Sequence, residues 1–292
     1  MQPNAVGRML GLLGDEWTLL IAQQALLGAT RYAEFADRLP ISNSVLALRL
    51  TAMTRAELLD RVAYQSNPPR NEYRLTPRGR ALWPMLVSIW AWEQRWVPEH
   101  DLPAMRHGLC GQDFSPALTC PACGALADEN SLVAQWGPTG SWRRSMPVSA
   151  TRRRSHGDRS AQADLFPQTM NILGNRWSFA IIVAAFVGTT RFTDFADQLG
   201  APPGSLADRL QGLVASQVLM VNDGRYRLTE KGRAVLPIIL TALAWAQRWF
   251  TTSEGPAVVV THSRCGNEFR AALACDQCQE TLSGSEIEQH PR

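Results

Sequence analysis

Residues 14–39 read GDEWTLLIAQQALLGATRYAEFADRL, and residues 174–199 repeat this stretch as GNRWSFAIIVAAFVGTTRFTDFADQL. The spacing of 160 residues holds as far as Leu50 and Leu210, and it falls to 153 at Tyr73 and Tyr226. A period this long indicates duplicated domains and excludes a solenoid of short repeats. With 292 residues, of which 45% are hydrophobic, the chain is large enough to bury two separate cores.

Three helices are expected at the start of each copy. In the first copy, apolar residues at helical spacing predict a helix of about three turns that ends near Leu27; they are Leu10, Leu13, Trp17, Leu20 and Ile21. A second helix is predicted over 31–39, where Pro40 interrupts it. Ser42 can cap a third helix, whose Leu46, Leu50 and Met53 share one face.

A hairpin and a closing helix follow the three helices. Strands are predicted over 59–65 and 72–76, and a long helix from Thr76 through Trp96. In the second copy, Asn-Asp-Gly within 221–225 predicts a tight turn in place of the longer hairpin tip. The order of elements predicts a mainly α fold with small β-hairpin wings: two winged helix-turn-helix domains in one chain.

Several stretches also resemble a known family. They are GDEWTLLI, LLGATRYAEF, LPISNSVLALRL and NEYRLTPRGRAL in the first copy, and GNRWSFAI, FVGTTRFTDF, PPGSLADRL and RYRLTEKGRAV in the second. The chain resembles the HxlR-type regulators, relatives of the MarR group. This resemblance implies a DNA-binding transcription factor that dimerises through its terminal helices, here as a pseudo-dimer of two copies within one chain.

The resemblance carries further expectations about function. We expect a sequence-specific regulator of double-stranded DNA, a repressor, acting on an imperfect palindrome whose half-sites lie about 34 Å apart. Release by a small-molecule effector and a further homodimer are additional expectations. The alternative is a descendant of the fold that has lost DNA binding and sequesters a ligand or another protein.

Two departures from the family pattern affect these expectations. Glu57 and Gln217 stand where the family has a glycine after the third helix, so we expect that helix end to be remodelled. Family members that sense oxidants use a cysteine near the N-terminus, but no cysteine precedes Cys110. That sensing mechanism is therefore not transferred to this chain.

The second helix of a helix-turn-helix motif presents its N-terminal part to the major groove of DNA. The predicted DNA contacts are Asn43, Ser44, Ala47, Leu48, Arg49, Thr51, Arg55, Arg70 and Asn71 in the first copy, and Ser205, Arg209, Gln211, Arg225 and Arg227 in the second. Because both copies share Arg49 and Arg209, a helix-capping role or a salt bridge within each domain fits these residues as well as DNA contact does. Asp208 would repel phosphate, so the second copy is expected to be the weaker reader.

All six cysteines lie in two short units of identical spacing. The candidate ligands are His107, Cys110, Cys120 and Cys123, and then His262, Cys265, Cys275 and Cys278. Three thiolates and one imidazole suit Zn²⁺, so we predict two structural zinc sites in zinc-ribbon-like units, one site per repeat. A redox pair at Cys120 and Cys123 is the competing interpretation. A complete Cys3His site leaves no open position for catalytic water.

These motifs give the predicted domain boundaries. They are 1–100 for the first winged helix-turn-helix, 101–135 for its zinc-ribbon-like unit, 136–164 for an Arg-rich linker, 165–252 for the second winged helix-turn-helix, 253–285 for its unit and 286–292 for a tail. The net charge of +3 comes from this linker, which contains six arginines and only two aspartates. The linker is either a solvated tether or an arm that contacts phosphates.

The tryptophans, and the motifs that the sequence lacks, lead to three further expectations. Trp17, Trp90, Trp92, Trp96, Trp177, Trp245 and Trp249 either line a ligand pocket or serve core and inter-module packing. The sequence contains no segment of about 20 apolar residues and no export signal, which favours a cytoplasmic protein without a membrane partner. It also contains no catalytic triad, nucleotide loop or open metal site, which argues against an enzyme.

Overall fold

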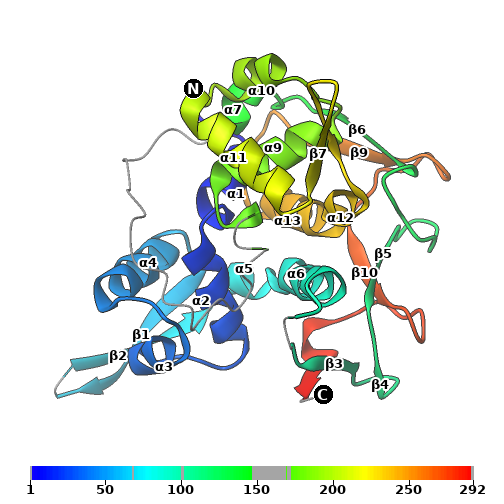
Figure 1. The fold of residues 1–292 in the computed structure, drawn as a ribbon. Coiled ribbons are helices and arrows are strands. Elements are labelled where there is room, and N and C mark those ends of the chain that lie inside the picture. The colour runs from blue at the N-terminus through cyan, green and yellow to red at the C-terminus, as the bar shows by residue number, and fades with distance from the viewer. Residues whose placement is uncertain (1, 68, 100–101, 147–168, 170–171, 291–292) are drawn as a thin grey trace.

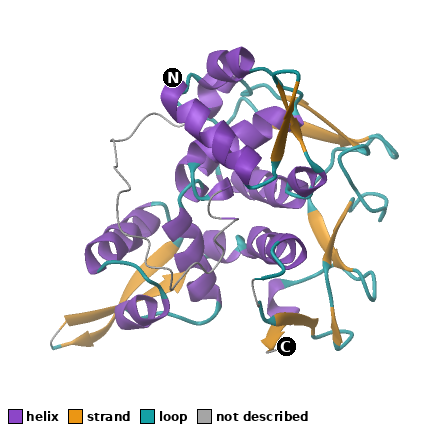
Figure 2. Cartoon of the chain, viewed as in Figure 1, coloured by secondary structure: helices purple, strands orange, loops and turns teal. Residues whose placement is uncertain are grey.

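The computed structural model describes residues 2–67, 69–99, 102–146, 169 and 172–290. The first winged helix-turn-helix module comprises α1 (Ala5–Leu13), α2 (Glu16–Leu26), α3 (Tyr32–Arg38), α4 (Asn43–Arg55), β1 (Leu59–Ser66), β2 (Pro69–Leu75), α5 (Pro77–Arg80) and α6 (Trp83–Trp96). The second comprises α9 (Arg176–Phe186), α10 (Phe192–Leu199), α11 (Pro203–Ala215), β7 (Leu219–Asn222), β8 (Arg225–Leu228), α12 (Glu230–Arg233) and α13 (Leu236–Trp249). Figures 1 and 2 show the β1–β2 hairpin projecting beyond α3 and α4. The predicted mainly α fold with β-hairpin wings is confirmed.

The first helix of the sequence prediction is two helices. It breaks between α1 and α2 at Gly14, where Asp15 caps α2 by accepting a hydrogen bond from the Thr18 amide. Asp15 also forms an antiparallel bridge with Asn175, its equivalent in the second copy. A Cβ on Gly14 would lie 2.8 Å from the Cα of Arg176. Close approach of the two repeats therefore explains the glycine and the break, which an apolar stripe does not reveal.

The closing helix is also divided in both copies. In the first, α5 and α6 replace the single helix expected from Thr76 to Trp96, and α12 and α13 repeat this division. Helices α6 and α13 pack against each other. Trp92 Nε1 donates to the Lys231 carbonyl at 3.0 Å, and Trp245 Nε1 donates to the Arg78 carbonyl at 2.9 Å. These equivalent bonds join the two modules reciprocally.

Short strands fill the part of the chain that follows each module. They are β3 (Ala104–His107), β4 (Gln112–Asp113), β5 (Pro116–Thr119), β6 (Leu132–Trp136), β9 (Val258–His262), β10 (Ala272–Cys275) and β11 (Ile287–His290). Three antiparallel pairs, β5 with β10, β6 with β9 and β11 with β3, join strands of different repeats. Figure 1 shows green β5 beside orange-red β10. Each unit is thus completed by strands from the other repeat.

The first part of the predicted linker is folded. Trp136 ends β6, and α7 (Trp142–Ser145) packs against α1. Buried Asn4 donates from Nδ2 to the Thr139 carbonyl and to Ser145 Oγ, both at 3.0 Å. A solvated tether is therefore wrong for residues 136–146, whose backbone and hydroxyl groups complete this polar network. Residues 147–164 of the predicted linker lie outside the described residues.

The expected remodelling of the third helix end does not occur. Glu57 and Gln217 adopt left-handed φ values of 57° and 61°. After them, the amides of Leu58 and Val218 donate to the carbonyls of Met53 and Leu213, both at 2.9 Å, as in a Schellman motif. The Glu57 carbonyl accepts from Thr76 Oγ1 at 2.6 Å, and the Gln217 carbonyl accepts from Thr229 Oγ1 at 2.5 Å. These bonds hold a conformation that normally favours glycine.

No helix among the described residues is both long enough and apolar enough to cross a bilayer.

The left-handed helix ends give a stability prediction. Gln217→Gly should raise the free energy of unfolding by about 0.5–1 kcal/mol, because relief of the left-handed strain exceeds the added entropy of the unfolded chain. Glu57→Gly should gain less, since it also removes a 3.0 Å ion pair with Arg78. Chemical denaturation measures both. Ala207→Gly, inside α11, is the control and should lower stability by about 0.5–1 kcal/mol; a loss of stability in Gln217→Gly would contradict the strain argument.

Candidate nucleic-acid interface and metal centres

Helix α4 has one buried face and one exposed face. Ser42 caps it by accepting a hydrogen bond from the Val45 amide, and Leu46, Leu50 and Met53 are buried. Among the predicted DNA contacts on α4, Asn43, Ser44, Ala47, Leu48, Thr51 and Arg55 are exposed. Leu48 is 47% exposed although it is a large apolar residue. The helical period therefore leaves these side chains free to meet a partner.

Arg49 differs from the other residues predicted on this helix. Its Nη2 lies 2.6 Å from Asp15 Oδ2, and each side chain is only 22% exposed. The salt bridge links α4 to the start of α2, where Asp15 also contacts the second repeat. The structure thus supports the alternative interpretation of Arg49, as a residue that positions α4.

The wing of the first module carries several arginines. Arg70 is exposed and Asn71 is half-buried on β2, which pairs with β1 through an irregularity between Ala63 and Gln65. Arg31, which the sequence prediction did not assign to DNA, lies with its guanidinium carbon 4.9 Å from the ring centroid of Tyr64. The sequence feature that could have singled out Arg31 is that both copies have an arginine at this position, Arg31 and Arg191.

The equivalent face of the second module has a different chemical character. Gln211, Arg225 and Arg227 are exposed, and Ser205 and Arg209 are half-buried. Asp208 is also exposed on α11. The turn of this wing has left-handed Asp223 and Gly224, which confirms the predicted tight turn. This face therefore presents a carboxylate where the first module has Leu48.

The seven tryptophans are spread through the modules. Trp92 and Trp245 make the reciprocal bonds between modules, whereas Trp17, Trp96, Trp177 and Trp249 are half-buried and pack against the core. Trp90 donates to the Pro103 carbonyl at 3.0 Å and also borders a hollow of about 400 Å³ with Met105, Phe114 and His290. Of the seven predicted pocket residues, only Trp90 lines this hollow.

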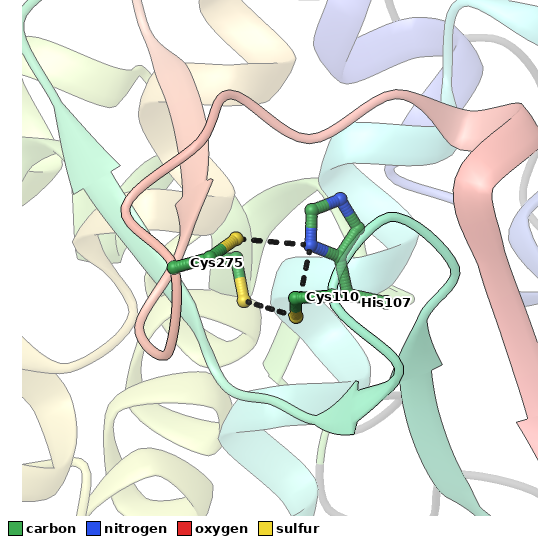
Figure 3. A group of neighbouring side chains, drawn as sticks. His107, Cys110 and Cys275 are labelled. Atoms are coloured by element: carbon green, nitrogen blue, oxygen red, sulfur yellow. Dashed lines mark hydrogen bonds between the residues drawn. The ribbon is translucent and has the colours of Figure 1, made fainter.

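The eight predicted metal ligands form two groups, but not one per repeat. His107 and Cys110 of the first unit meet Cys275 and Cys278 of the second. Cys120 and Cys123 meet His262 and Cys265. Figure 3 shows His107, Cys110 and Cys275 turned toward one another. All eight predicted residues lie in groups that could hold a metal ion, whereas the pairing within each repeat is wrong because strand exchange brings opposite halves together.

The distances in both groups fit a tetrahedral zinc ion. In the first group, His107 Nδ1 lies 3.5 Å from Cys110 Sγ and 3.4 Å from Cys278 Sγ, and Cys110 Sγ lies 3.9 Å from Cys275 Sγ. The second group has the matching separations of 3.4, 3.4 and 3.9 Å. Ordinary Zn–S and Zn–N bond lengths predict about 3.8 Å between sulfurs and about 3.6 Å between sulfur and nitrogen.

Hydrogen bonds favour the thiolate form of one cysteine in each group. Backbone and side-chain hydrogen bonds from Asn267 lower the pKa of Cys265 to about 6. The backbone amide of Gln112 lowers the pKa of Cys110, the equivalent residue. Because metal ligation requires thiolates, these turns favour the ligand form of the cysteine before any metal binds. The sequence prediction did not assign a role to Gln112 or Asn267.

A twofold relation between the two units explains the exchange. In the β5–β10 pair, Leu118 lies opposite its own equivalent, Leu273, with Ala117 opposite Ala274 and Thr119 opposite Ala272. The β6–β9 and β11–β3 pairs are related in the same way, because Leu132 lies opposite His262 and Ile287 lies opposite His107. Each histidine therefore stands on a strand that pairs with the other repeat.

The cross-repeat pairing can be tested by zinc retention. Cys110→Ser with Cys275→Ser removes two ligands from one group, so one of two bound zinc ions should resist a chelator that the wild-type sites resist. Cys110→Ser with Cys120→Ser damages both groups and should leave none resistant. Zinc per chain, measured by elemental analysis, decides between them.

Single substitutions calibrate this zinc measurement. Cys110→Ser and Cys120→Ser should each leave one resistant ion, because each damages one group. Pairing within each repeat predicts the reverse pattern for the two double variants. One resistant ion in Cys110→Ser with Cys120→Ser, and none in the other pair, would therefore overturn the cross-repeat arrangement.

A comparison with protein families finds a match in each of the two modules. A family model described as HxlR-like helix-turn-helix matches residues 12–101 and 172–254. An HTH-type transcriptional regulator of Mycobacterium tuberculosis is 38% identical over 137 residues, which are 46% of this chain and 87% of that protein. The HTH-type transcriptional regulator YodB of Bacillus subtilis is 31% identical over 91 residues, 31% of this chain and 81% of that protein. A solved structure from Pseudomonas aeruginosa is 27% identical, covers 48% of this chain and 97% of that chain, and has a TM-score of 0.36.

The two segments matched by the family model together make up more than half of the chain. They contain both helix-turn-helix motifs, α3 with α4 and α10 with α11. The chain belongs to the HxlR-like helix-turn-helix family.

Proposed function

We propose that this chain is a cytoplasmic, sequence-specific DNA-binding transcriptional regulator, a repressor whose two modules act as an intramolecular pseudo-dimer. The observation that carries the proposal is the exposed face of α4, capped by Ser42 and supported by the Arg49–Asp15 ion pair. An exposed second helix of this motif enters the major groove, where base edges are distinguishable. The HTH-type names of the similar proteins give the same indication.

The two modules contribute unequally in this proposal. Asn43, Ser44 and Thr51 offer polar groups on α4, and exposed Arg70 offers a phosphate contact on the wing. Exposed Asp208 on α11 would repel phosphate, so the second module contributes weaker contacts. The operator is accordingly an imperfect palindrome with one strong half-site. Binding of a small-molecule effector would alter the relative placement of the modules.

Two zinc ions complete the proposed protein and have a structural role. Each Cys3His group supplies four donors, which fill a tetrahedral site and leave no position for a reacting water. When bound, zinc would cross-link short strands that have little apolar core of their own. The reducing cytoplasm suits this role because all six cysteines are free thiols.

Matched acidic substitutions test the proposed reading helix. Ser44 and Gly204 occupy the second position of α4 and α11 respectively, where an acidic residue is compatible with the helix dipole. Ser44→Glu should weaken specific DNA binding about 10- to 100-fold by placing a negative charge in the groove. Gly204→Glu should cause a clearly smaller loss. Fluorescence anisotropy on DNA from the upstream region of the gene, beside scrambled DNA and across a salt series, measures both.

Folding controls make the DNA result decisive. A Cβ at Gly204 would meet no atom within 4 Å, and Ser44 is exposed, so neither variant should unfold at a lower midpoint than wild type. Equal losses would contradict the unequal modules. Unchanged specific affinity in Ser44→Glu would contradict α4 as the reader. No sequence preference in zinc-loaded wild type would favour the alternative, a ligand- or protein-binding descendant of the fold.

A further inference from the structure

We propose that the two metal sites are fasteners between the repeats, so that metal occupancy sets the relative placement of the two DNA-reading modules. The proposal rests on the proposed function for its DNA consequence, but the fastening itself follows from the ligand exchange. Each site takes one ligand pair from each repeat, so in this arrangement neither site is complete without both repeats. Metal binding and association of the repeats are consequently coupled equilibria.

The chain that carries each second ligand pair forms a strap across to the opposite module. In the first repeat, the strap runs through Cys120 and Cys123 to Glu129, which pairs with Arg233 of the second module at 3.1 Å. In the second repeat, it runs through Cys275 and Cys278 to Gly284, which lies against the Trp83 ring of α6. Glu129 and Gly284 are equivalent positions. Both straps therefore cross in opposite directions and end on the other module.

Each strap forms a hydrogen-bonded turn around its cysteine pair within its own repeat, whereas most of its strand pairing is with the other repeat. Among the described strands of these units, β3 and β4 pair within one repeat, through only Arg106 with Asp113 and His107 with Gln112. The longer pairs, β5 with β10, β6 with β9 and β11 with β3, all join different repeats. A strap without its metal would keep short strands and exposed loops. A bound metal would thus add a ligand bridge between the repeats at each crossing.

The modules also pack against each other through their helices, and the buried residues of both modules belong to one hydrophobic cluster. This contact includes the reciprocal tryptophan bonds, the Asp15–Asn175 bridge, the packing of α6 and α1 on α13, and the packing of α1 on α9. These contacts lie between the two modules, whereas the metal sites lie on the straps that extend from them. Helix packing would hold the modules near each other, and the two metals would fix their mutual orientation.

Cutting the chain once between the repeats distinguishes the contribution of helix packing from that of the metal sites. A protease site is inserted between residues 150 and 160, and the purified full chain is cleaved with two zinc ions bound. The two fragments should co-elute in size exclusion with zinc, and chelation should weaken their association at least about 100-fold. Zinc added back to the mixture should restore co-elution, whereas zinc added to either separated fragment should give no tightly bound ion.

A variant that keeps one metal group serves as the control for the cleavage experiment. Cleaved Cys110→Ser with Cys275→Ser retains one complete group, so its fragments should associate with intermediate affinity. Fragments that associate equally well before and after chelation would overturn the fastening, as would one tightly held zinc ion on a separated fragment. Circular dichroism on the zinc-free mixture should still report the helices of both modules, which separates unfastening from general unfolding.

DNA binding by the uncut chain tests the regulatory consequence. Chelation should lower affinity for DNA with both half-sites at least about tenfold, because the modules lose the spacing that permits simultaneous contact. It should leave affinity for one isolated half-site unchanged. Equal loss on both DNAs would overturn control through spacing. Lack of sequence preference with zinc bound would overturn the proposed function. The co-elution experiment would still test, independently of DNA, whether the metal sites hold the two repeats together.

Discussion

The pairing of Leu118 with Leu273 is the constraint on which the other strand exchanges depend. Two equivalent residues lie opposite each other only where a twofold relation passes between them. From that point, antiparallel pairing carries each strand end toward the other repeat, and the two histidines reach strands that the opposite repeat completes. A separate unit would have to fold β5 back on its own strands. Its short apolar segments offer little area for such a core, and so exchange is the arrangement that satisfies both backbone and ligands.

The same twofold relation also explains the residues between α1 and α2. Gly14 permits the Arg176 backbone to approach, and Asp15 then serves three contacts: the cap of α2, the bridge to Asn175 and the ion pair with Arg49. The last of these reaches α4, the helix proposed to read DNA. A change in the crossing of the repeats is thereby connected to α4 by direct contacts. Because Arg49 forms this ion pair, substituting it would also disturb the position of α4. A loss of DNA binding in an Arg49 variant would therefore not identify a direct DNA contact.

The sequence was sufficient to predict the modules and the residues that form the two Cys3His groups. Helical spacing of Leu46, Leu50 and Met53, the Ser42 cap and the turn at Asp223 are local signals, and the structure agrees with each. The division of the first helix at Gly14 and the pairing of His107 with Cys275 depend on the other repeat. Spacing within a motif is the same whether its halves bind together or apart. Identical motifs in two copies therefore leave the pairing open, because each half is an equally good partner.

The left-handed residues after α4 and α11 show a second limit of local reasoning. Glycine is favoured there when only the backbone conformation is considered. Thr76 and Thr229, distant in sequence from the helix ends, supply hydroxyl donors to the carbonyls of Glu57 and Gln217. These threonines also cap α5 and α12, so each joins the end of the proposed reading helix to the helix that leads into the inter-module contact. Side chains other than glycine are accommodated because the tertiary hydrogen bond offsets part of the strain. The helix end is consequently fixed by the same residues that begin the closing helices, which connects the DNA-facing and interface parts of each module.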